Sequence, residues 1–172
     1  LSKQITQINQ PAVISILKIV DNSLNFNRSL FKNLPFRNQL IKNNKMFKIY
    51  NDSKCTNIEN AIMKNNMILS SNKILILGGK PKISNKNYII EKTLILIFGK
   101  YAFQISKKLV CKNSNYFIFN NLFDLLSFTK IIIQKSKYNT ILFSPGGESF
   151  DQFKSFNERG EYFNYLIKKL KF

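Results

Sequence analysis

The sequence contains no histidine and no tryptophan, and only two of its 172 residues are cysteine. The absence of histidine excludes Ser-His and Cys-His catalytic dyads and the common histidine-rich zinc sites. The longest apolar runs have about five residues, as in 94–98, far short of the roughly 20 that a membrane-spanning helix needs. Cys55 and Cys111 form no C-x-x-C pair, and we interpret them as reduced thiols of a cytoplasmic protein with no membrane contact.

Acidic residues are scarce as well: 9 Asp and Glu stand against 27 Lys and Arg, which gives a formal net charge of +18. A chain this basic raises the question of a nucleic-acid partner. However, only three of the basic residues are arginine, the lysines are not clustered, and no aromatic stacking motif accompanies them. The heavy use of Asn, Ile, Lys and Phe is typical of AT-rich codons, so we favour codon bias over a polyanionic partner.

Hydrophobic residues make up 44% of the chain, which is enough for a packed core. From residue 38 onward the pattern predicts continuous apolar strands alternating with helices, which is typical of a parallel sheet covered on both faces. The predicted fold class is therefore α/β, with a Rossmann-like, mostly parallel sheet and an antiparallel hairpin at its start. The predicted strands are 38–42, 45–50, 73–77, 93–98, 116–119 and 140–143, and the predicted helices are 56–68, 100–111, 121–136 and a C-terminal stretch opened by a capping box at Ser149.

The chain begins with Leu1, and its first 20 residues lack the features of a signal peptide. Residues 11–20 are predicted to be a helix with proline in its first turn. This helix starts abruptly, and we expect the chain to have been separated from an upstream portion.

Three loops follow predicted strands and fall at the carboxyl ends, where open α/β sheets bind ligands. They are 51–57 (NDSKCTN), 78–82 (GGKPK) and 144–153 (SPGGESFDQF). Two of them lead into helix N-termini, which favour anions, so we predict a pocket for phosphates or carboxylates. The alternative interpretation is that these residues have only structural roles. Thr56 and Ser149 would then be helix caps, the glycines would form tight turns, and Asp52 would be a surface turn residue. For Cys55, the favoured role is that of a small buried residue that fills space in the core.

Together these segments resemble the Mur ligase family, in its D-glutamate-adding branch. Residues 51–57 match the family's N-D-S-K-A-T-N at six of seven positions, and 76–82 resemble I-x-G-G-x-x-K. Residues 142–160 resemble L-L-S-P-x-x-x-S-x-D-Q-F-x-x-F-x-x-R-G, and 34–37 stand where the family has L-P-H-R.

The resemblance implies that residues 34–172 are the family's C-terminal domain and that 1–33 are the tail of its central ATP-binding domain. It implies a ligase that uses ATP and Mg²⁺ to add D-glutamate to UDP-N-acetylmuramoyl-L-alanine. By the same resemblance, the residues expected to hold D-glutamate are Lys82, Ser149, Phe156, Thr56 and Lys54, and those expected to face the nucleotide are Arg37, Asp52 and Asn9.

The chain also departs from the family pattern. Phe36 replaces a histidine, Gln39 replaces a glutamate, and in 8–12 only Asn9 matches the family's H-N-x-x-N. The Walker loop, the magnesium ligands and the uridine-binding domain are absent from these residues, so we expect no ligation by this chain alone. The alternatives are a non-catalytic remnant or binding domain and, less favoured, a basic nucleic-acid-binding module.

Overall fold

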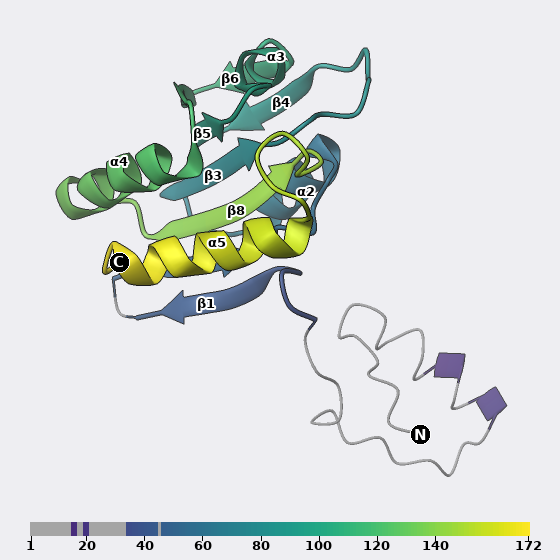
Figure 1. Ribbon diagram of the computed structural model, residues 1–172, viewed down its shortest axis with the longest axis horizontal. Coiled ribbons are helices and arrows are strands. Elements are labelled where there is room, and N and C mark those ends of the chain that lie inside the picture. The colour runs from purple at the N-terminus through teal and green to yellow at the C-terminus, as the bar shows by residue number, and fades with distance from the viewer. Residues whose placement is uncertain (1–14, 17–18, 21–33, 45) are drawn as a thin grey trace.

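A six-stranded sheet forms the centre of the molecule in the computed structural model, which describes residues 15–16, 19–20, 34–44 and 46–172. The strand order is β1-β2-β8-β3-β5-β7 (Figure 1). All neighbours are parallel except β1 and β2, which form the predicted antiparallel hairpin. The strands are β1 (Gln39–Asn43), β2 (Lys48–Asn51), β3 (Lys73–Gly78), β5 (Thr93–Phe98), β7 (Asn115–Phe119) and β8 (Thr140–Gly146).

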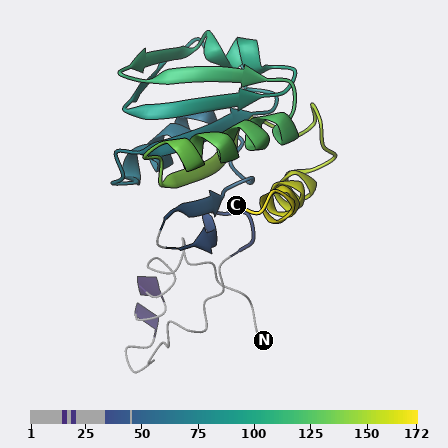
Figure 2. The ribbon, with the colours of Figure 1, turned by 90° about the vertical axis from the view of Figure 1, so that its left-hand side faces the viewer.

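Helices cover both faces of the sheet, as the sequence predicts. Figures 1 and 2 show α5 and α2 on opposite sides of it. Helices α4 and α5 pack on one face, while α2, α3 and a small parallel sheet of β4 and β6 pack on the other. The bounds are α2 (Ile58–Met67), α3 (Ala102–Ser106), α4 (Leu122–Lys135), α5 (Phe156–Lys169), β4 (Tyr88–Glu91) and β6 (Leu109–Lys112).

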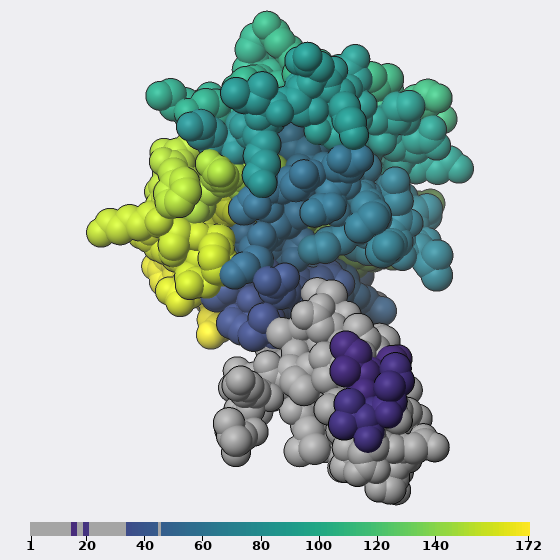
Figure 3. Space-filling view, turned by 90° about the vertical axis from the view of Figure 1, so that its right-hand side faces the viewer, coloured from purple at the N-terminus to yellow at the C-terminus, as the bar shows by residue number. Residues whose placement is uncertain are grey.

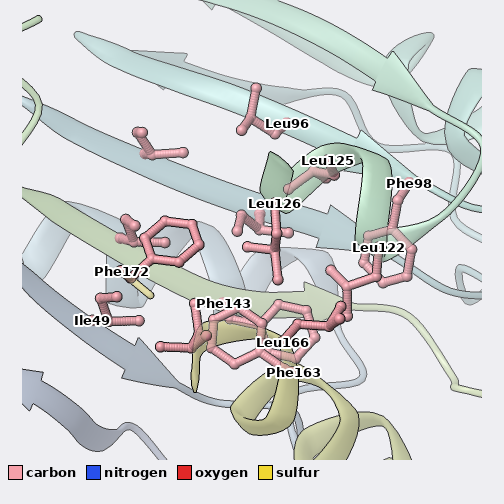
Figure 4. Packing of buried hydrophobic residues seen from close by; sticks show 14 of the residues in the cluster. Ile49, Leu96, Phe98, Leu122, Leu125, Leu126, Phe143, Phe163, Leu166 and Phe172 are labelled. Carbon is pink, nitrogen blue, oxygen red and sulfur yellow. The ribbon is translucent and has the colours of Figure 1, made fainter. Parts of the chain in front are cut away.

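The central strands are apolar on both faces because each face is covered. Every residue of β3, β5 and β8 is buried. Alternate residues point to opposite faces, so Ile76 belongs to the core under α4 and α5, while Leu75 and Leu77 belong to the core under α2 and α3. In the first core (Figure 4), Phe143 of β8 stacks on Phe163 of α5 with ring centroids 4.1 Å apart.

Several predicted boundaries are wrong. The N-cap of α2 is Asn57, whose side chain accepts from the N–H groups of Glu59 and Asn60; Thr56 is not the cap. The C-terminal helix begins at Phe156 with Ser155 as its cap, not at Ser149. The capping-box spacing occurs at both places in the sequence, and the residues after Ser149 instead form turns that close the loop after β8.

The helix predicted over 100–111 is also too long. The structure has the short helix α3 and then β6, which pairs with β4, a strand the sequence analysis did not include. Pairing with β4 determines that residues 109–112 form a strand and not a helix. Val110 pairs with Ile89, and the local periodicity of the sequence does not reveal this partner.

Some expectations lie outside the described residues. Asn9 and most of the predicted helix 11–20 fall there, although residues 15–16 and 19–20 are described as helical and exposed. The assignment of 1–33 to a central domain, with a boundary at residue 34, therefore stays a prediction. Among the helices of the described part, none has the length and apolar character to cross a membrane.

Candidate functional site

The three loops predicted to converge do so at the carboxyl edge of the sheet. Figure 3 faces this edge, with the yellow-green residues that follow β8 beside the blue residues of the neighbouring loops. The backbones of Lys80 and Glu148 exchange two hydrogen bonds of 2.8 Å, which join the loop after β3 to the loop after β8. Gly146 N–H donates to the carbonyl of Cys55 at 3.1 Å, which adds the loop after β2. Gly79 allows the close approach, because its φ is +85° and a Cβ would lie 2.4 Å from the Glu148 carbonyl oxygen.

Arg159 of α5 ties these loops together from behind. Its side chain is fully buried. The guanidinium donates to Ser53 Oγ at 3.1 Å, to the Ser53 carbonyl at 2.7 Å and to the Gly147 carbonyl at 2.9 Å. Burial lowers the pKa of this guanidinium to about 10, an effect that nearby Asp151 opposes, so Arg159 stays charged at neutral pH. A buried fork of five N–H groups suits this task of joining several acceptors.

Asp52 is a second buried charge at the end of β2. Its Oδ1 accepts from Asn38 N–H at 2.9 Å, and its Oδ2 accepts from Ser144 Oγ at 2.8 Å and from Lys64 Nζ at 2.6 Å. The carboxylate is completely buried, whereas the Lys64 side chain is 28% exposed. Asp52 is thus not the exposed turn residue of the structural alternative: it links the hairpin, α2 and β8.

A pocket of about 250 Å³ is lined in part by Asp52. It brings together five of the eight predicted site residues: Arg37, Asp52, Lys54, Thr56 and Lys82. Four of the lining residues are cationic and one is acidic, so the pocket has the charge expected for an anionic ligand. The remaining lining residues are Cys55, Asn57, Asn60 and Lys64.

Phe156 and Ser149 do not line this pocket. Phe156, the first residue of α5, lies beside it: Lys54 Nζ is 4.0 Å from the centroid of the Phe156 ring, a cation–π contact that orients the lysine. Ser149 is buried in the loop after β8, and its carbonyl accepts from the N–H groups of Gln152 and Phe153. Its backbone therefore closes a turn, and Ser149 is not among the residues that line the pocket.

Phe36, which stands where the resembled family has histidine, is a packing residue. Its side chain is buried, and a Cβ on Gly160 would lie 2.4 Å from the Phe36 ring. Its backbone lies in the left-handed region with φ of 61° and is held by Gln39, whose Oε1 accepts from Phe36 N–H at 3.1 Å. The Phe36 carbonyl accepts from Lys54 N–H at 3.0 Å, so the backbone of Phe36 helps to hold Lys54, which lines the pocket.

Sequence reasoning missed the lining residues Asn60 and Lys64, and it did not single out Asn57 within the loop 51–57. They are spaced by three and four positions at the start and along one face of α2, which is the signal that could have found them. Cys55, interpreted as a buried filler, is buried, and its Sγ donates to the Asn57 carbonyl at 3.3 Å. Both cysteines are free thiols, as the sequence indicates.

A larger hollow of about 450 Å³ lies elsewhere, at the amino ends of the strands near Thr93. Lys92 and Lys137 line it among uncharged, mostly polar residues. None of the residues that resemble family motifs reaches it, so volume alone does not identify the candidate site.

Asp151 is the least satisfied charged group near the site. Neither of its carboxylate oxygens has a hydrogen-bond partner, although both are buried. Burial raises the pKa of this carboxyl, and the nearby backbone N–H groups of Asp151 and Gln152 and the charge of Arg159 offset the shift only in part. An acid with a raised pKa in the folded state makes the protein less stable once it ionises.

We therefore expect Asp151→Asn to change how stability depends on pH. The contribution of Asp151 to the stability of the wild type is most favourable below the ordinary aspartate pKa of about 4, and it is lost as the pH rises through the higher pKa of the folded state, because there the native state holds more protons than the unfolded state. Removing this group should flatten that fall. Urea unfolding between pH 3.5 and 7 measures the effect, with Glu161→Gln on the exposed face of α5 as control. An unchanged slope in Asp151→Asn would contradict the assignment.

Comparison with known proteins identifies curated relatives of this chain. The chain is 32% identical over 157 residues to the UDP-N-acetylmuramoylalanine–D-glutamate ligase of Petrotoga mobilis. This alignment covers 88% of the chain but only 35% of the relative. The chain is also 38% identical over 148 residues to the ligase of the same name from Buchnera aphidicola (81% and 32% covered), and 36% identical over 151 residues to that of Prochlorococcus marinus (83% and 32% covered). No family model matches.

The α/β fold and these similarities confirm the resemblance of the chain to the Mur ligases. In particular, it is similar to the C-terminal portion of UDP-N-acetylmuramoylalanine–D-glutamate ligase. It spans about a third of the length of the curated relatives it matches.

Proposed function

We propose that this chain is the D-glutamate-binding, C-terminal part of an ATP-dependent ligase of peptidoglycan biosynthesis, which builds the cell wall. The observation that supports this proposal most is the basic pocket: Arg37, Lys54 and Lys82 come from three separate segments and meet in one hollow. D-glutamate brings two carboxylates, which charge-assisted hydrogen bonds from lysine suit.

Within this proposal the residues of the chain divide the work. Lys82 and Thr56 hold a carboxylate of D-glutamate, and Lys54, oriented by the ring of Phe156, adds a second cation. Holding both carboxylates fixes the amine of D-glutamate so that it can attack an activated carbonyl of UDP-N-acetylmuramoyl-L-alanine. Ser149 shapes the loop after β8 behind the pocket rather than entering it.

ATP, bound with Mg²⁺, supplies the activation of that carbonyl as an acyl phosphate. The described residues contain no group of three or more His, Cys, Asp or Glu that could hold a metal ion, so we assign Mg²⁺ to the rest of the ligase. Arg37 is suited to a phosphate, because its Nε is buried without a partner. Asp52 is suited to a ribose hydroxyl only if Lys64 leaves its Oδ2. The free cysteines suit a cytoplasmic setting.

The test is to supply the missing part. The chain is mixed with the N-terminal and central domains of the Buchnera aphidicola ligase, and phosphate release is measured with ATP, Mg²⁺ and UDP-N-acetylmuramoyl-L-alanine. We expect release that depends on D-glutamate, no release with L-glutamate, and none from either part alone.

Three results would count against the proposal. Phosphate release by the chain alone would show that the chemistry is misassigned. D-glutamate binding by calorimetry without any ligation in the mixture would favour the alternative of a non-catalytic binding domain, and the absence of both would exclude the D-glutamate site.

A further inference from the structure

The carboxylate of Asp52 belongs to the wall of the basic pocket, yet its neighbours close it to a ligand. Oδ1 accepts from Asn38 N–H at 2.9 Å, and Oδ2 accepts from Ser144 Oγ at 2.8 Å and from Lys64 Nζ at 2.6 Å. The exposed fraction of Asp52 is 0%. A sugar hydroxyl could bind this carboxylate only by displacing one of these donors and leaving it buried without a partner, which is costly.

Lys64 presents a charge to the pocket where Asp52 does not. It stands in the last turn of α2, and the pocket-lining residues Asn57 and Asn60 precede it on the same face. The Lys64 side chain is 28% exposed, so it keeps accessible surface while its ammonium group holds the buried carboxylate. An ammonium group has three N–H donors and the bond to Asp52 uses one, so Lys64 can hold a ligand oxygen at the same time.

Lys64 and Lys82 lie at different ends of the basic pocket. Lys64 also lines an adjoining hollow of about 440 Å³, together with Asn38 and residues of β2 and the end of α2. Lys82 instead lines a second adjoining hollow of about 190 Å³ at the start of α2. The proposed D-glutamate site around Lys82 therefore lies at one end, and Lys64 lies at the other, with Asn38 and its chain neighbour Arg37.

The charges of the pocket divide in the same way. D-glutamate has two carboxylates, and under the proposed function Lys82 and Lys54 are the lysines that hold them. The remaining cations that line the pocket are Arg37 and Lys64. Two cations at one end of a pocket suit the adjacent anionic oxygens of a phosphate chain, which accept charge-assisted hydrogen bonds.

We propose that Lys64, and not Asp52, meets the nucleotide at this end of the pocket, and that it binds a phosphate oxygen while the ribose hydroxyls go without a carboxylate partner. This inference rests on the proposed function and changes the role that the resemblance implies for Asp52, which becomes the residue that positions Lys64. The pair offers the nucleotide a donor for phosphate and no acceptor for a hydroxyl. The ligase should therefore not distinguish ATP from ATP that lacks one ribose hydroxyl.

Nucleotides that lack one hydroxyl test this inference without any substitution. The chain is mixed with the N-terminal and central domains of the Buchnera aphidicola ligase, and phosphate release is measured with ATP, 2′-deoxy-ATP and 3′-deoxy-ATP at saturating D-glutamate. We expect the three KM values to agree within threefold. A KM for either deoxy nucleotide at least tenfold above that for ATP would overturn the inference, because an acceptor such as Asp52 would then hold the ribose.

Calorimetry of the full chain with inorganic triphosphate gives a second readout that needs no ligation. Lys64→Met should weaken triphosphate binding about tenfold and raise the KM for ATP by a similar factor, since one charge-assisted hydrogen bond is lost, with little change in the KM for D-glutamate. Lys64→Arg keeps a cation beside Asp52 and should stay within threefold of the wild type. The control is Lys48→Met, which removes a cation from the 440 Å³ hollow outside the basic pocket and should stay within twofold.

The two readouts separate this inference from the proposed function. No phosphate release with ATP in the mixture counts against the proposed function, and triphosphate binding then decides about Lys64. Equal losses in Lys64→Met and Lys48→Met would overturn the inference, because overall charge would explain both, as would a wild type that does not bind triphosphate. If Lys64→Met does not fold, because Asp52 is left buried without its cation, the deoxy nucleotides decide alone.

Discussion

Arg159→Met should lower the free energy of unfolding by about 3–5 kcal/mol, as expected when one member of a buried charged network is removed. The carbonyls of Ser53 and Gly147 lose their donors inside the protein, and the buried carboxylate of Asp151 loses its nearby cation. A domain of this size is typically stable by about 5–15 kcal/mol, so the loss is a large fraction of the total. Urea unfolding followed by circular dichroism measures it.

Two further variants make this test specific. Arg159→Lys keeps the charge but cannot reach both carbonyls with one ammonium group, so its loss should be smaller but still about 2 kcal/mol. Lys168→Met removes a cation from the exposed face of the same helix and should change stability by no more than about 0.5 kcal/mol. Equal losses in Arg159→Met and Lys168→Met would mean that Arg159 does not hold the loops together.

The approach of the three loops could be predicted from the sequence because it follows from one rule. Continuous apolar strands such as 73–77 and 93–98 indicate a parallel sheet, and parallel strands end at the same edge. A pocket that combines Lys54 and Lys82 therefore needs only the strand assignments, and the structure places both residues in it.

What holds the loops in place could not be predicted. Arg159 stands 106 positions from Ser53, and no local pattern shows that its guanidinium is buried. Likewise, Ser149 and Ser155 both carry a capping-box spacing, and only the packing of α5 on the sheet decides between them. Gln39 holds the left-handed backbone of Phe36, and Gly160 leaves room for its ring, so the packing role of Phe36 also emerges from tertiary contacts.

Lys82 and Lys80 offer a matched pair within one loop. Both side chains are exposed, but Lys82 lines the basic pocket, whereas Lys80 is held by its backbone pairing with Glu148 and does not line it. Alanine at position 80 keeps those backbone bonds. The two substitutions thus remove the same charge from the same loop and differ in their position relative to the pocket.

In the ligase reconstituted with the missing domains, Lys82→Ala should raise the KM for D-glutamate roughly tenfold to a hundredfold. The reason is the loss of a charge-assisted hydrogen bond to a ligand carboxylate, worth about 1.5–3 kcal/mol once the ligand excludes water, and each 1.4 kcal/mol corresponds to a factor of about ten. The KM for ATP should change much less, since this lysine is assigned to the amino acid, and Lys80→Ala should be nearly neutral for both substrates. Steady-state phosphate release with each substrate varied in turn measures all four constants. Equal effects at the two positions would mean that the loop contributes only diffuse positive charge, and a polyanionic partner would then explain the basic surface better than D-glutamate does.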